Sequence, residues 1–203
     1  MKFVDLIRNT LINSSILMLF RISSLFLSIL LINNLEVESF ANFQLIKNAI
    51  GYLLVSMEFG FFHYGNNLFN RDSYRFKSIL YNFIKLRSLV FLIVFPLIIM
   101  YFYLNQFELE IIFLSSLLCI FLIFSYEGAL VAINKNLQLN SILLLKTLIF
   151  IFLIFIYKDI LTINKVLNFF IYSLIFSIVI QYIIYLSFKD KNIKTLKNKF
   201  YKF

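Results

Sequence analysis

Long apolar stretches alternate with short polar breaks along the whole chain. Six stretches of about 20 residues or more follow one another, at 11–32, 40–63, 80–103, 108–133, 138–157 and 163–188. Each can cross a hydrocarbon core of roughly 30 Å as a helix that rises about 1.5 Å per residue. The residue-by-residue alternation of a membrane β-strand is missing from the sequence. The pattern therefore predicts an all-α membrane protein, a bundle of about six transmembrane helices.

The composition agrees with a membrane environment. Hydrophobic residues make up 62% of the 203 residues and charged residues 14%, whereas about 25% of the residues of a soluble domain are charged. A soluble globule of this size has too little interior to hide so much apolar material. These proportions exclude a water-soluble enzyme, a disordered chain and a disulfide scaffold.

The basic residues predict the orientation of the spans. The chain has 19 Lys and Arg against 10 Asp and Glu, and such an excess collects in cytoplasmic loops of membrane proteins. With the N-terminus inside, 14 basic residues lie on the inner side and two, Lys158 and Lys165, in outer loops. Both termini are then cytoplasmic and the number of spans is even.

A lysine-rich tail follows the last predicted span. Residues 189–203 carry six lysines, which fits either a signal that fixes the cytoplasmic side or contact with anionic lipid head groups. We expect the lipid bilayer, and no nucleic acid, to be the partner of this tail.

Three basic residues, Arg21, Lys47 and Lys146, lie within the predicted spans. A charge there costs about 2.5–3.5 kcal/mol on the insertion scale, so it is expected to face the protein interior or a wet cavity. Arg21 shares a helix face with Ser14 and Ser28, since seven residues end about 20° from two full turns. Arg21 therefore either pairs with Glu58 or Glu127 from another helix or faces a cavity that holds an anion.

Other spans also carry polar faces. Such faces either pack helices together through small and polar side chains or line a polar path. At helical spacing, the aligned sets are Lys47, Gly51, Glu58 and Gly65; Ser116, Glu127 and Asn134; and Ser173, Ser177 and Gln181.

Signals of catalysis are sparse. The chain has one histidine, His63, and one cysteine, Cys119, and its carboxylates are scattered. Neither a metal centre nor a nucleophile with its base can be assembled from such a set. We therefore expect no catalytic residues, no metal, no cofactor and no enzymatic activity.

Two runs carry a family resemblance. The first, NTLINSSILMLFRISSLFLSILLINNLEVESFANFQLIKNAIGYLLVSMEFGFFHYGNNLF, contains Asn9, Arg21, Phe43 and the step Phe59-Gly60-Phe61. The second, YEGALVAINKNLQLNSILLLKTLIF, contains Gly128, Ala132 and Asn134. In this order, the features resemble the N-terminal six-span lobe of Wzx-type polysaccharide (O-antigen) flippases. These proteins belong to the multidrug/oligosaccharidyl-lipid/polysaccharide exporter superfamily.

The resemblance has two departures. The first outer loop has Glu36 and Ala41 where the family usually has glycines. The chain also has one lobe where the family has two, so the resemblance implies half of a flippase. Its partner is then a second six-span lobe or another copy of itself.

The resemblance implies a function and a location. The resemblance implies that the chain translocates undecaprenyl-diphosphate-linked oligosaccharide across the bacterial inner membrane, as part of polysaccharide biosynthesis. Arg21, Lys47 and Lys146 then bind the anionic carrier, and Glu58 and Glu127 tune the charge or couple to an ion. Two alternatives stay open: a non-transporting or truncated membrane subunit, and a small membrane enzyme of glycan or lipid assembly.

Overall fold

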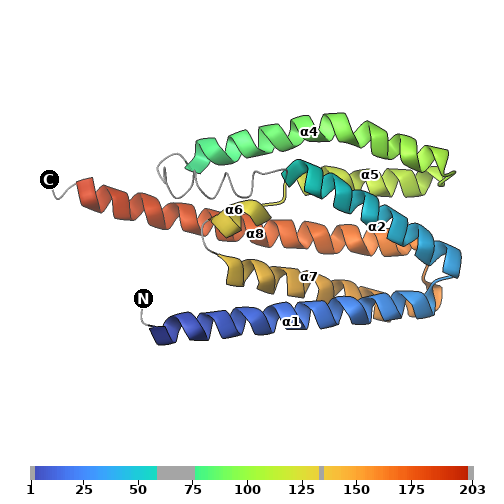
Figure 1. Ribbon diagram of the computed structural model, residues 1–203, viewed down its shortest axis with the longest axis horizontal. Coiled ribbons are helices and arrows are strands. Elements are labelled where there is room, and N and C mark those ends of the chain that lie inside the picture. Colours follow the sequence, from blue (N-terminus) through green and yellow to red (C-terminus); the bar gives the residue numbers. More distant parts are fainter. Residues whose placement is uncertain (1–2, 59–75, 133–134, 201–203) are drawn as a thin grey trace.

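The protein is an elongated bundle of helices (Figure 1). The computed structural model describes residues 3–58, 76–132 and 135–200, with side chains over 7–57, 84–127, 130–131 and 135–187. The helices are α1 (Phe3–Asn34), α2 (Val37–Glu58), α4 (Phe76–Leu104), α5 (Leu109–Ile123), α6 (Glu127–Ala132), α7 (Asn136–Ile156) and α8 (Ile163–Phe200), with a 3₁₀ turn at Lys158–Ile160.

The long helices run up and down the bundle. In Figure 1 the connections from α1 to α2, from α4 to α5 and from α7 to α8 lie at one end, and both termini lie at the other. These three connections, together with the helix starts beside them, contain five acidic residues: Glu36, Glu38, Glu108, Glu110 and Asp159. The predicted outer segments therefore lie together at one end of the bundle. Their side of a membrane stays a prediction.

Four helices are long and apolar enough to cross a membrane. They comprise Ile7–Asn34, Ile84–Leu104, Asn136–Ile156 and Ile163–Ser187, which correspond to the first, third, fifth and sixth predicted spans. The more polar α2 does not reach this standard, and α5 is a shorter apolar helix of 15 residues. Throughout the described part of the chain the secondary structure is helical. The all-α class is thus confirmed, and the count of six spans stays a prediction.

The fourth predicted span differs from the structure. We expected one helix over 108–133, but α5 ends at Ile123 and α6 begins at Glu127. The expected alignment of Ser116 with Glu127 on one helix was therefore wrong, and Asn134 lies outside the described residues. The hydropathy pattern missed the break because Phe124, Ser125 and Tyr126 are neither glycine nor proline. Side chains of α4 and α8 bond to the backbone of this break.

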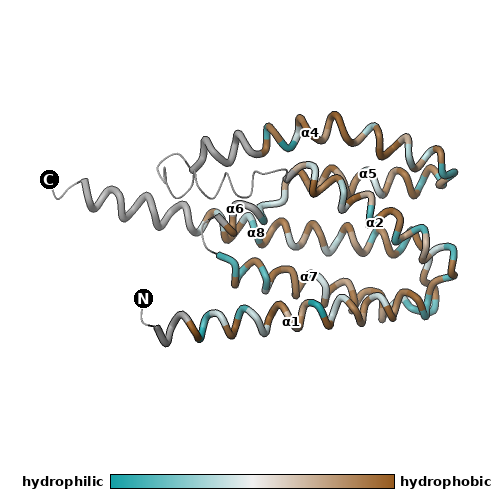
Figure 2. Tube along the Cα trace, viewed as in Figure 1, coloured by the Kyte–Doolittle hydropathy of each residue, from teal (hydrophilic) through white to brown (hydrophobic). Residues whose placement is uncertain are grey.

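The most buried of the long apolar helices is α8, and α5 is also strongly buried; their fully buried side chains include Leu167 and Leu118. At the other extreme, α1 packs mainly along α7, and its outer face is apolar and exposed. Leu11, Met18 and Leu25 are each more than 60% exposed, as a surface in contact with lipid tails would be. Figure 2 shows hydrophobic residues along all the long helices, interrupted by isolated polar positions.

Candidate functional site: a lysine-lined cavity

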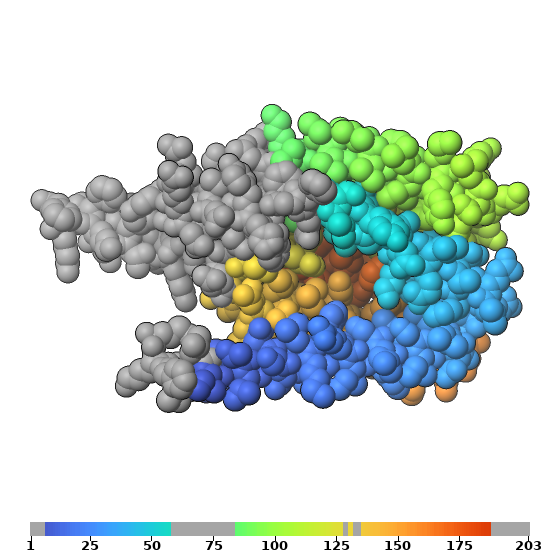
Figure 3. All heavy atoms as spheres, viewed as in Figure 1, coloured from blue at the N-terminus to red at the C-terminus, as the bar shows by residue number. Residues whose placement is uncertain are grey.

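A cavity of about 170 Å³ lies between α1, α2, α7 and α8. Figure 3 shows the surface hollowed between α1 and α2, with atoms of α7 and α8 visible in the hollow. The short loop of two residues between α1 and α2 sets these helices side by side at one end only, so they diverge along the bundle (Figure 1). The lining residues are Phe20, Ser24, Leu27, Ser28, Leu31, Phe43, Gln44, Lys47, Lys146, Thr147, Phe150, Phe170 and Ser173.

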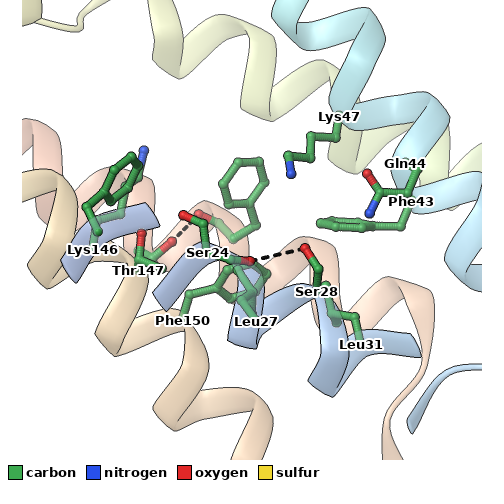
Figure 4. A pocket seen from close by; sticks show the side chains of 13 residues that line it. Ser24, Leu27, Ser28, Leu31, Phe43, Gln44, Lys47, Lys146, Thr147 and Phe150 are labelled. Carbon is green, nitrogen blue, oxygen red and sulfur yellow. Dashed lines mark hydrogen bonds between the residues drawn. The ribbon is translucent and has the colours of Figure 1, made fainter. Parts of the chain in front are cut away.

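Two of the three predicted anion-binding residues, Lys47 and Lys146, line this one cavity. Figure 4 shows Lys47 reaching from α2 into the gap, and Lys146 on the α7 side of it. Lys47 lies ten residues after the start of α2, and Lys146 ten residues after the start of α7. Both lysines thus sit near the middle of their helices, and neither makes an ion pair with a carboxylate whose side chain is described.

Polar groups surround the lysines. Ser28 Oγ donates a hydrogen bond to the Ser24 carbonyl oxygen at 3.1 Å, and Thr147 Oγ1 donates to the Leu143 carbonyl at 3.0 Å. The hydrogens of these two hydroxyls are thus used within α1 and α7, whereas the Ser24 hydroxyl bonds to no described residue. Gln44, three residues before Lys47 on the same face of α2, has no hydrogen bond to any described residue. Its amide N–H groups and the two ammonium groups can all donate to an anion.

Aromatic and aliphatic side chains form the rest of the wall. The ring of Phe43, 3% exposed, meets Phe170 edge-on at 6.4 Å, and Phe150 stacks on Phe170 at 5.4 Å. Such a wall lowers the local dielectric constant, which strengthens the attraction between an ammonium group and an anion. The cavity therefore combines two cations with an apolar surface.

Arg21 does not line the cavity, and its side chain is exposed. It lies on the flank of α1, within about 20° of the direction of Ser28, because seven residues separate the two. The structure thus brings Lys47 and Lys146 together and leaves Arg21 outside. A substrate contact by Arg21 stays a prediction.

Of the two predicted charge-tuning residues, Glu127 lies apart from the cavity lining. Glu127 begins α6, where its backbone N–H donates to Ser125 Oγ at 3.4 Å. It forms no ion pair with Arg21. Glu58 ends α2, and its side chain lies outside the described residues. Their predicted roles, charge tuning or ion coupling, stay predictions.

The sequence reasoning missed Gln44, Ser24 and Thr147 as cavity residues. Two of them carried a readable signal. Gln44 lies one helical turn before Lys47, and Ser24 lies one turn before Ser28. Thr147 could not be found in this way, since its position depends on how α7 packs beside α1.

No protein-family model, curated protein or solved structure matches the chain. Among the residues that the structure describes, no group of three His, Cys, Asp or Glu side chains could hold a metal ion. The functional argument therefore depends on the cavity and on the arrangement of the helices.

Proposed function

We propose that this chain is one lobe of a flippase for undecaprenyl-diphosphate-linked oligosaccharide in the bacterial inner membrane. In this proposal the diphosphate of the carrier binds between Lys47 and Lys146. The observation that carries it is that both ammonium groups line one cavity near the middle of their helices without an acidic partner among the described side chains.

The cost of these charges supports a ligand. A lysine at the centre of a membrane helix costs about 2.5–3.5 kcal/mol on the insertion scale, and ionisable residues within membranes usually mark a path or a binding site. A diphosphate compensates both charges at once through charge-assisted hydrogen bonds. The Gln44 amide and the Ser24 hydroxyl, which line the same cavity, can donate further hydrogen bonds to it.

The helix arrangement supports a membrane lobe. Four helices are apolar enough to cross, and α2 together with the α5–α6 pair would complete six crossings. The start of α1 and the end of α8 lie at the same end of the bundle (Figure 1). This arrangement fits an even number of crossings, which the distribution of basic residues also predicts. A second lobe, or a second copy of the chain, would face the open side of the hollow.

One polar row favours the alternative of a packing subunit, but only for α8. Ser173, Ser177 and Gln181 are at most 1% exposed, and their hydrogen bonds are made within the protein. This row stabilises the bundle. The cavity, which Ser173 also lines, differs because its ammonium groups and the Gln44 amide have no such partner among the described residues.

Binding of the bare carrier tests the proposal. The purified chain, reconstituted in nanodiscs, is titrated with undecaprenyl diphosphate and, separately, with uncharged undecaprenol. We expect the diphosphate to bind the wild type at least about tenfold more tightly than the variant Lys47→Met/Lys146→Met, because each lost charged hydrogen bond removes about 1.5–3 kcal/mol.

The matched control is Lys165→Met, which removes a lysine whose Nζ donates to the Ile160 carbonyl outside the cavity. This variant is expected to bind like the wild type. Equal affinity of wild type and the double variant for the diphosphate, or equal affinity of the wild type for undecaprenol, would overturn the proposal.

A further inference from the structure

The break between α5 and α6 occurs where the local sequence does not require one. Residues 124–126 read Phe-Ser-Tyr, the single proline of the chain is Pro96, and the nearest glycine, Gly128, lies inside α6. Sharp interruptions of helices usually have a proline, a glycine or an inserted side chain as their cause. Here the third cause applies, because two side chains from other helices reach the backbone of the break.

The backbone of the break changes its hydrogen-bonding pattern. The N–H groups of Phe124 and Ser125 donate to the carbonyls of Phe121 and Leu122, each three residues earlier, at 3.1 Å. The Leu122 carbonyl is therefore used by Ser125 and not by Tyr126, four residues later, as in a continuous α-helix. The N–H of Tyr126 loses its partner on its own helix and needs another one.

Two side chains supply the missing partners. Gln181 of α8 accepts the Tyr126 N–H on Oε1 at 2.9 Å, and its Nε2 donates to Ser177 Oγ at 3.1 Å. Arg87 of α4 donates from Nη1 to the Ser125 carbonyl oxygen. In a continuous helix that carbonyl would accept the N–H of Ala129. The rings of Tyr182 and Tyr185 pack on Tyr126 at 5.5 Å.

We infer that residues 124–126 form a two-state joint, which Arg87 and Gln181 hold in the broken state. The alternative state is a continuous helix from α5 through α6. The sequence of residues 124–126 permits this state, because it contains neither proline nor glycine. Every backbone group of the joint then finds its partner within the helix, the arrangement that a membrane span favours. The two side chains therefore favour the broken state, because they replace there two partners that the continuous helix would supply from its own backbone.

The joint lies where a change of shape would reach other elements. The N–H of Lys135, next to the first residue of α7, donates to the Leu130 carbonyl of α6 at 2.8 Å, and α6 packs on α7 and α8. Straightening the joint would thus move α6 relative to α8 and shift the start of α7, at the end of the bundle that holds both termini (Figure 1). This inference does not depend on the proposed transport activity.

Spin-label distances in the full chain test the joint. Labels are placed at Phe113→Cys on α5 and Val131→Cys on α6, in a Cys119→Ser background in nanodiscs. A continuous helix puts these positions five turns apart on one face, at about 27 Å. We expect the labelled protein with Arg87 and Gln181 intact to give a main distance different from this value. We expect the double variant Arg87→Met/Gln181→Met to move the main distance to about 27 Å.

Two matched variants keep the result interpretable. Gln181→Glu retains an acceptor oxygen and is expected to keep the wild-type distance. Ser88→Ala removes a hydroxyl that, among the described residues, bonds to the Ile84 carbonyl of its own helix, and is also expected to change nothing. An unchanged distance in the double variant would overturn the inference. So would a broad distribution without a population near 27 Å, or a wild-type distance already at that value.

Discussion

Two polar regions lie between the helices of this apolar bundle, and they differ in how their polar groups are satisfied. At the α5–α6 break, the Gln181 amide bonds to the Tyr126 backbone and to Ser177. In the cavity, Lys47, Lys146 and Gln44 bond to none of the described residues. Both regions contain long polar side chains on helices. At the break these side chains bond to other groups of the protein, whereas in the cavity they can still bind a ligand.

The difference separates structural polarity from functional polarity. A buried polar group with its partners supplied by the protein contributes to stability, and losing one partner leaves the other unsatisfied. A charge left without a partner lowers stability and is retained when something else binds it. Substitutions in the two regions are therefore expected to affect the free energy of unfolding in opposite directions.

Gln181→Ala should produce the largest loss of stability. The side chain is 1% exposed, so its removal leaves a void and deprives Ser177 and the joint of a hydrogen-bond partner. We expect a decrease of about 2–3 kcal/mol in the free energy of unfolding, measured in bicelles by steric trapping. A loss below about 0.5 kcal/mol would show that this amide does not stabilise the bundle.

Lys47→Met should change stability much less and in the other direction. The substitution preserves the length of the side chain and removes a charge that no described residue compensates. We expect the free energy of unfolding to stay equal or to rise by up to about 0.5 kcal/mol, because Lys47 is exposed in the structure and substitutions at such positions usually change stability little. A clear decrease in the same bicelle assay would mean that Lys47 has a structural partner.

Much of the fold could be predicted from hydropathy and charge. Four of the six predicted spans correspond to helices that can cross a membrane, because uninterrupted apolar stretches leave the backbone little choice but a helix. The break after Ile123 was missed because its cause, Arg87 and Gln181, lies on other helices. A pattern along one segment carries no trace of such contacts.

The cavity was predictable to a similar extent. The cost of a charge within a predicted span singled out Lys47 and Lys146, and the structure places both at the cavity, with Lys146 partly buried and Lys47 exposed. The same reasoning singled out Arg21, which lies on an exposed flank of α1. The cost of a charge within a span identifies residues that need an explanation. The face of α1 that contacts α7 is decided by packing between the two helices, so it cannot be predicted from the sequence of α1 alone.

The most direct test of the cavity as an anion site is ligand protection of a single thiol inside it. Ser28→Cys in a Cys119→Ser background places a thiol on the cavity wall, and N-ethylmaleimide reports its accessibility in nanodiscs. Val37→Cys, at a position 87% exposed and outside the cavity, is the control.

We predict that undecaprenyl diphosphate slows the labelling at position 28 at least about tenfold, while undecaprenol does not and position 37 reacts unchanged. Labelling at position 28 that proceeds equally fast with and without the diphosphate would contradict the account.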